Sequence, residues 1–361
     1  MKNLFINPII LFATLLMWIF SSTTTSAQEV ISVSPSAGST VTIDGNVISI
    51  EGGGATVDIS SDGDQIVQRK GGNIIINGRA LEDILNDNDN DNDNYNYNDN
   101  DYPRKVVGSK ERSTRTVELA KDFNYIKASR GVDVVMSDEK GNKATISANS
   151  NLIDYVICRS SGGTLTVGVD DKVRNLSNFH VEITIPRRDN INVYQVASGA
   201  SINIHPELTC ANVSMEVASG GSVNCSRINC DKLLIEASSA GSVSGSFKIK
   251  ECGIVETSSA ADINISALSP ELNLKASSGS TINVSGQVKH LDVDASSAAN
   301  IKAYNLNAVT AEAEASSGAS VKLNCSKSLE AEASSAADIR YTGDCSVERR
   351  ASSGGSVKKV D

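Results

Sequence analysis

Carboxylates recur at two fixed positions of a repeat that fills the C-terminal half of the chain. Each copy ends on an aliphatic residue, and acidic side chains stand seven and nine positions before it. The carboxylates are Glu216, Glu236, Glu256, Asp292, Asp294, Glu312, Glu314, Glu330 and Glu332. Like charges stacked at a regular spacing need solvent or a counter-ion to screen them. This candidate interaction face could bind calcium or a basic partner, or it could be a solvated face that keeps sheets from aggregating.

A second outward position turns basic toward the C-terminus. One residue after the closing aliphatic residue stand Asn203, Asn224, Asn264 and Asn283, followed by Lys302, Lys322, Arg340 and Lys358. The formal charge of the whole chain is nevertheless −10, which argues against nucleic acid as a partner. Only 4% of the residues are aromatic, and the single tryptophan is Trp18, so few side chains can stack on sugars or bases.

A serine stands four positions before the aliphatic residue in every copy. The serines are Ser198, Ser219, Ser239, Ser259, Ser278, Ser297, Ser317, Ser335 and Ser353. Nine equivalent nucleophiles do not make one catalytic site, so we predict a structural turn ladder. The residue after each serine is always glycine or alanine, which predicts a tight bend where a larger side chain would clash with the neighbouring coils. The hydroxyls are expected to satisfy backbone groups and to hydrogen-bond along the stack.

No group of residues has the spacing of a catalytic or metal site. Asp262 and Asp338 share a column, but four coils separate them, which is about 19 Å at strand spacing. The three histidines, His180, His205 and His290, are scattered and have no nucleophile at a recognisable motif. No C-x-x-C pair or Cys/His cluster occurs. We therefore predict no catalytic residue, no metal site and no cofactor, with calcium as the one alternative.

Seven cysteines raise the question of disulfides. Cys210 and Cys230 each lie 13 residues before the aliphatic residue that closes the next repeat, so they would stack on neighbouring coils. Coils about 4.8 Å apart fall within the Cα separation that a disulfide tolerates. A disulfide between the two residues and a column of small buried thiols both fit this spacing.

The repeat itself predicts the fold. Its nine copies run from residue 197 to residue 357 with a period of 18 to 21 residues, in the range of solenoids. Apolar residues alternate on both sides of the bend, as at Leu272, Leu274, Ile282 and Val284. This period of two is typical of strands that each feed one column of side chains into a shared interior. We predict an all-β fold, a right-handed parallel β-helix of about 20 residues per coil.

The remaining sequence divides into three further parts. Lys2, an apolar run over residues 9–20 and a small-residue site before Ala27 predict a signal peptide over residues 1–27. No later stretch is apolar and long enough to span a membrane as a helix. Short alternating runs separated by glycines predict a small β-rich segment over residues 28–85, with a short helix possible over 79–85. An Asn/Asp-rich linker follows over 86–116, and the β-helix domain takes 117–361.

The linker has one feature of a calcium loop. Asp87, Asp89, Asp91 and Asp93 alternate as in the acidic start of such a loop. The turn glycine and the closing glutamate of an EF-hand are missing. The composition therefore favours a solvated linker.

Residues 117–361 resemble the head GIN domain family of exported bacterial proteins, described as putative autotransporter-adhesin heads. The resemblance is carried by the motifs at residues 123–129, 131–135, 151–155, 163–167, 181–186, 339–343 and 352–361. It implies a β-helix with small-residue turns, similar in shape to pectin lyases but without their catalytic residues, and a role in cell adhesion. The family brings no established site residues. The implied location is extracytoplasmic, in the periplasm or on the surface of a bacterium.

Three functions are consistent with the sequence. We expect a non-enzymatic exported protein that acts in adhesion or envelope scaffolding through a charged face, with a surface protein or a glycan as its partner. A polysaccharide-active lyase or hydrolase is the alternative, and a cleft with two carboxylates within about 9 Å would favour it. A carbohydrate-binding module is the third possibility, which the scarcity of aromatic residues disfavours.

Overall fold

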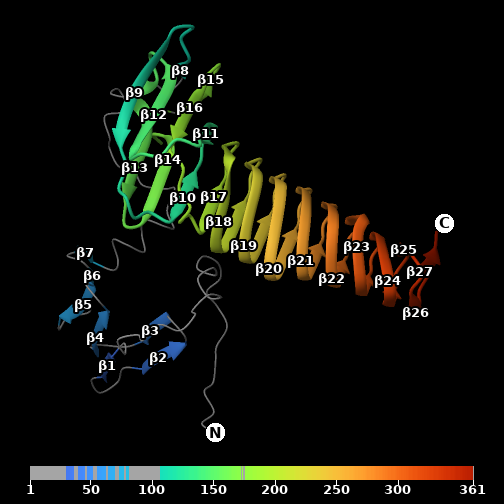
Figure 1. The fold of residues 1–361 in the computed structure, drawn as a ribbon. Helices are drawn as coiled ribbons and strands as arrows, with labels where there is room; N and C mark the ends of the chain where they lie inside the picture. Colours follow the sequence, from blue (N-terminus) through green and yellow to red (C-terminus); the bar gives the residue numbers. More distant parts are fainter. Residues whose placement is uncertain are drawn as a thin grey trace. The chain divides into compact units, whose positions relative to one another are not determined.

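The computed structural model describes residues 106–171, 173 and 175–360, together with the backbone of seven short strands between residues 30 and 80. The chain forms two compact units, residues 1–97 and 98–361 (Figure 1). The described elements are strands, apart from the 3-10 turn η1 (Ile153–Tyr155). The predicted signal peptide and most of the Asn/Asp-rich tract lie outside the described residues.

The first unit contains two small antiparallel sheets. One has the order β1-β4-β5-β6-β7, with bounds Val30–Pro35, Ala55–Ser61, Asp64–Arg69, Asn73–Ile76 and Arg79–Ala80. The other is the hairpin of β2 (Thr40–Asp44) and β3 (Val47–Glu51). The predicted β-rich segment is thus made of strands. The expected helix over 79–85 is wrong at its start, because β7 pairs with β6 there, and residues 81–85 lie outside the description.

An antiparallel layer opens the second unit. Strand β9 (Arg112–Glu118) pairs with β12 (Lys143–Asn149), which also pairs with β16 (Val181–Ile185). Strands β13 (Val156–Ser161) and β14 (Thr164–Val169) form a hairpin, and β8 (Val106–Val107) pairs with β15 (Leu176–Ser177). The last residues of the predicted linker belong to this layer, because Arg112–Glu118 pairs with β12 and Val106–Val107 pairs with β15.

A first coil connects this layer to the repeat array. Strands β10 (Tyr125–Ala128) and β11 (Val132–Met136) are joined by a short turn. Strand β10 pairs in parallel with β14 on one side and with β17 (Val193–Val196) on the other. Strand β11 likewise lies between β16 and β18 (Ser201–Val217). The coil stack therefore begins with residues 125–136, one coil before the array that the sequence shows.

The array is a stack of parallel coils (Figure 1). After β18 come β19 (Ser222–Ala237), β20 (Ser242–Thr257), β21 (Asp262–Ala276), β22 (Thr281–Ala295), β23 (Asn300–Ala315), β24 (Ser320–Ala333), β25 (Asp338–Thr342), β26 (Ser346–Ala351) and β27 (Ser356–Lys359). The stack has about eight turns of about 20 residues. The predicted all-β solenoid is confirmed.

Register is what aligns the columns. Ile263 lies opposite Ile282, and Ile282 lies opposite Ile301, each with no exposed surface. Burial of such an aliphatic side chain contributes about 1.5–3 kcal/mol, and every coil repeats it. Because side chains alternate along each strand, the inward columns of one coil fix which residues point outward. The core therefore positions the charged faces.

Candidate functional site: two charged faces and an apolar groove

The nine serines lie in the turns that close the coils. In each turn the residue before the serine accepts a hydrogen bond from the N–H three positions later, at 2.8–3.2 Å. The serine and the residue after it both have positive φ, as at Ser198 (54°) and Gly199 (71°). Two successive residues of positive φ define a type I′ turn. The ladder is therefore a row of identical tight turns.

Conformation rather than space selects glycine or alanine after the serine. A Cβ built at Gly199, Gly220, Gly279 or Gly318 would meet no atom within 4 Å, so the predicted clash between coils is wrong. A positive φ near 70° is what disfavours larger residues there. Alanine accepts the same conformation at Ala240, with φ of 61°.

The turns stack through their backbones. The N–H after one serine donates to the carbonyl of the serine on the next coil, from Gly199 to Ser219 through to Ala336 to Ser353, at 3.0–3.2 Å. The nine serine side chains are exposed. The bonds that link neighbouring turns therefore come from main-chain groups, and not from the serine hydroxyls as the sequence had suggested.

One further turn belongs to the ladder and was missed from the sequence. Arg130 (φ 62°) and Gly131 (φ 67°) take the two turn positions, and the Gly131 N–H donates to the Ser198 carbonyl at 3.0 Å. Glycine is required here by space as well, since a Cβ would lie 2.6 Å from the ring of Phe179. The signal was the small-residue step at 128–131, obscured because arginine replaces the serine.

The acidic side chains form two adjacent columns along the stack. Register partners place Glu216, Glu236 and Glu256 in one line, which continues through Lys275 to Asp294, Glu314 and Glu332. The second line runs through Asp292, Glu312 and Glu330 to Glu348. All nine predicted carboxylates therefore lie on one face, which we call the acidic face.

Two cations neutralise part of the acidic face, one within its column and one at its C-terminal end. Lys275 pairs with Glu256 at 3.1 Å. At the C-terminal end Arg350 reaches Glu348 at 2.8 Å and Glu330 at 3.6 Å. Among the described residues, no lysine or arginine nitrogen lies within 4.0 Å of Asp294, Glu312 or Glu314. Asp294, Glu312 and Glu314 therefore form, in the described part of the chain, a run of carboxylates without an ion pair on β22 and β23.

Glu236 shows the electrostatic cost of stacking carboxylates. Burial raises the pKa of its carboxyl, and the neighbouring Glu216 and Glu256 carboxylates raise it further. Its Oε2 atom is buried and has no hydrogen-bond partner among the described residues. The ionised form is thus disfavoured at this position.

The basic positions form their own column on the other side of the turn. Asn264, Asn283, Lys302, Lys322 and Arg340 are register partners on successive coils, and Lys358 closes the line. Arg340 binds Asp338 at 2.6 Å. Acidic and basic columns consequently flank the turn ladder toward the C-terminal end of the solenoid.

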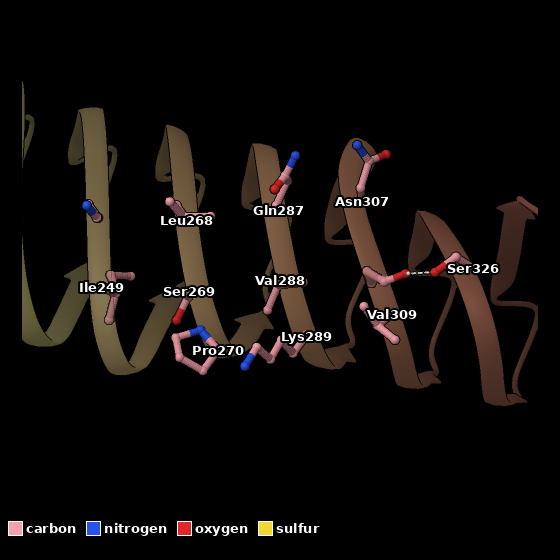
Figure 2. Close-up of a pocket in the computed structure, with 12 residues that line it drawn as sticks. Ile249, Leu268, Ser269, Pro270, Gln287, Val288, Lys289, Asn307, Val309 and Ser326 are labelled. Atoms are coloured by element: carbon pink, nitrogen blue, oxygen red, sulfur yellow. Dashed lines mark hydrogen bonds between the residues drawn. The ribbon is translucent and has the colours of Figure 1, made fainter.

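A shallow apolar groove of about 460 Å³ crosses the coils of β20 to β24. Leu268, Gln287 and Asn307 lie in a row on its surface (Figure 2). Leu268 and Val309 are 47% and 44% exposed, unusual values for residues of their size. No carboxylate or histidine lines the groove. The sequence signal for this groove is Leu268, a leucine in an outward position two residues before Pro270.

The residues considered for catalysis are not brought together. His180 Nδ1 lies 3.9 Å from Asp133 Oδ2, and His290 Nδ1 lies 3.0 Å from the Thr310 hydroxyl. Within the described residues, no three His, Cys, Asp or Glu side chains form a group that could hold a metal ion. The acidic face carries closely spaced carboxylates on adjacent strands, and none of them lines the groove that crosses β20 to β24.

Cys210 and Cys230 are register partners on β18 and β19, as the spacing predicted. All seven cysteines are free thiols in this structure. Burial raises the pKa of Cys210 to about 11 and that of Cys230 to about 12.

Stacked parallel coils, a backbone turn ladder and charged outer columns define a β-solenoid. The family described as putative auto-transporter adhesin, head GIN domain, matches residues 122–271 and 244–345. The chain belongs to this family. No curated protein sequence gives a significant match.

Solved structures share the fold. A putative adhesin from Parabacteroides merdae ATCC 43184 aligns with a TM-score of 0.56 at 18% identity, covering 72% of this chain and all of that one. A putative adhesin and a putative lipid binding protein from Parabacteroides distasonis ATCC 8503 each align with a TM-score of 0.51, at 17% and 18% identity, covering 71% of this chain and all of theirs. In the described part of the chain, no helix has the length and apolar character of a membrane crossing.

Proposed function

We propose that this chain is an exported, non-enzymatic binding protein that contacts a partner through the acidic face, in adhesion or envelope scaffolding. The observation that carries the proposal is the run of uncompensated carboxylates on β22 and β23. Asp294 and Glu314 are exposed register partners, and Asp292 lies opposite Glu312 beside them. Like charges at this spacing destabilise a sheet, so a bound partner that neutralises them would gain energy from the contact.

The shape of the face suits a protein partner with a basic surface. The columns belong to paired strands of one continuous sheet, so the carboxylates hold their spacing before binding, which reduces the entropy lost on association. The carboxylates of the acidic face also accelerate the encounter with a positively charged surface, and salt weakens this effect. A glycan is the alternative partner, and the composition offers it few aromatic platforms.

The test compares two sets of substitutions on the two charged columns. The first replaces Asp292 and Asp294 by asparagine and Glu312 and Glu314 by glutamine, and the control replaces Lys302 and Lys322 by glutamine. The measurement is the binding of the labelled protein to cells of the organism that makes it, at two salt concentrations. We expect the acidic-face variant to bind at least about tenfold more weakly, a loss of 1.4 kcal/mol, and the control to bind as before. Equal binding by both variants, or salt-independent binding, would refute the proposal.

Export needs its own experiment. Fractionation of the producing cells, followed by protease treatment of intact cells, separates surface display from periplasmic residence. We expect the chain in an extracytoplasmic fraction, and recovery only from the cytoplasm would contradict this.

A further inference from the structure

We infer that Cys210 and Cys230 form a disulfide that cross-links the first two long coils of the solenoid. The two residues are Cα partners in the parallel register of β18 and β19. Adjacent strands lie about 4.8 Å apart, and disulfides accept Cα separations of about 4.4–6.8 Å. The register thus places the two residues within reach of one another without a shift of the backbone.

The side chains of this pair point to the same side. Cys210 follows the buried Leu208 at the alternate position, and Cys230 follows the buried Ile228 in the same way. Each thiol therefore extends toward the interior of the coil, one above the other. The proximity of Cys210 is also one cause of the raised pKa of Cys230, after burial itself.

The other cysteines are placed differently. Cys225 directs its thiol to the Ser244 carbonyl on the following coil, at 3.6 Å. Cys252 has Lys232 and Glu271 as its register partners. Cys325 donates to the carbonyls of Val309 and Ser328. Cys345 lies within hydrogen-bonding reach of Cys325, but these two residues are not register partners. Among the described cysteines, Cys210 and Cys230 are the pair that the sheet register places opposite one another.

The reaction needs an oxidant, and we assign this role to a disulfide, either of an oxidoreductase or of a small thiol compound. The Cys210 thiolate, on the more exposed residue of the pair, attacks the oxidant and releases one thiol. The Cys230 thiolate then attacks the Cys210 sulfur, so that the new S–S bond forms and the second thiol leaves. The two cysteines lose two electrons, the oxidant becomes two thiols, and these take up the two protons.

Burial of the two thiols determines when the disulfide can form. With pKa values near 11 and 12 in the folded coil, few thiolates exist near neutral pH. The bond should therefore form while the coils assemble, and it should then be protected from exchange.

The test counts thiols in the full chain after refolding with a mixture of glutathione and its disulfide. The protein is unfolded and alkylated with or without prior reduction, and its mass is measured. Five reactive thiols before reduction and seven after are expected. Cleavage after glutamate, lysine and arginine then places Cys210, Cys225 and Cys230 on three different peptides, because Glu216 and Arg227 lie between them. The expected product links the Cys210 peptide to the Cys230 peptide.

Substitutions of single cysteines test which residues form the disulfide. C210S and C230S should each abolish the linked peptide, whereas the matched control C252S should keep it. Oxidised wild type should melt about 5–10 °C above reduced wild type, and the reductant should not change the melting temperature of C210S. Seven reactive thiols in the oxidised wild type, a link to Cys225, or a link that persists in C210S would each overturn the inference. The thiol count needs no substitution, so it stands even if a variant fails to fold.

Discussion

The backbone N–H of Gly199 donates a hydrogen bond to the carbonyl oxygen of Ser219 on the next coil, 3.0 Å away. The two residues occupy different positions in their turns, because Gly199 follows the serine of its own turn. The same bond recurs along the ladder up to Ala336 and Ser353. Each turn is thus held both by its own closing bond and by the turn that follows it.

Substitution of the glycines that follow the serines should reduce stability because of their backbone φ, and not because a larger side chain lacks space. G279A places a Cβ in open space but at a φ of 70°, so we expect a loss of about 1 kcal/mol of unfolding free energy. G279V should cost more, because a β-branched side chain is further disfavoured at positive φ. Denaturant titration measures the unfolding free energy of G279A and of G279V. The reverse substitution, A336G, is the control and should raise the unfolding free energy by a similar amount, because it removes a Cβ at a φ of 63°. A loss of stability in A336G would contradict this explanation.

A cation placed in the middle of the acidic face should stabilise the fold. E314K puts a lysine between Asp294 and Glu332, its register partners on either side. We expect a gain of about 0.2–1 kcal/mol at low salt, which disappears in concentrated salt because these exposed charges are screened. The matched opposite change is K275E, which removes the ion pair with Glu256 and should destabilise. A gain that is independent of salt would show that the charge is not its cause.

Glu236 should make stability depend on pH in a specific direction. Its pKa is raised above the ordinary value of 4.5, first by burial and then by Glu216 and Glu256. The folded state therefore binds a proton more tightly than the unfolded state, and the contribution of this residue to stability decreases as pH rises through the window above 4.5. E236Q should have a higher melting temperature than wild type near neutral pH.

The same advantage should shrink as the solution is acidified below that window, because the wild-type carboxyl is then protonated in both states. Melting curves of wild type and E236Q across this pH range provide the measurement. E256Q is a useful comparison, since Glu256 forms an ion pair with Lys275. An advantage of E236Q that grows on acidification would rule out the electrostatic explanation.

The apolar groove should contribute little to stability. Leu268 is 47% exposed, so L268Q should change the unfolding free energy by less than about 0.5 kcal/mol. L272A, four residues later on the same strand, removes a fully buried side chain and should cost about 2–5 kcal/mol. If L268Q destabilised the protein as much as L272A, the groove would be part of the core.

The sequence specified the columns well because two simple rules apply together. Alternation fixes the inward side, and a constant offset from the turn fixes the register, so Asp292 and Glu312 could be matched without a structure. The reason for the small residues could not be obtained in this way, since a steric clash and a positive φ both favour glycine. Only the backbone geometry at Gly279 distinguishes them.

Other features depended on contacts between distant segments. The turn at Arg130 and Gly131 stacks on Ser198, which lies more than 60 positions away in the sequence. No repeat period reveals such a coil, because residues 137–192 intervene. Leu268 and Val309 could not be assigned to a groove either, since their exposure depends on where each strand bends.

Register shifts divide most of the coils into a constant and a variable part, although β21 and β22 pair without interruption. Register shifts fall between Ile204 and Glu207, between Asn224 and Ile228, and between Asn283 and Gly286, whereas the residues on both sides of each turn pair without interruption. Differences in coil length are therefore absorbed on the side far from the turn. Loss or gain of a single residue in the bulged part should leave the outward columns aligned. The same change beside a turn would move the following side chains of that strand to the opposite face. Insertions and deletions should therefore be tolerated in the bulged part of a coil and not beside the turn.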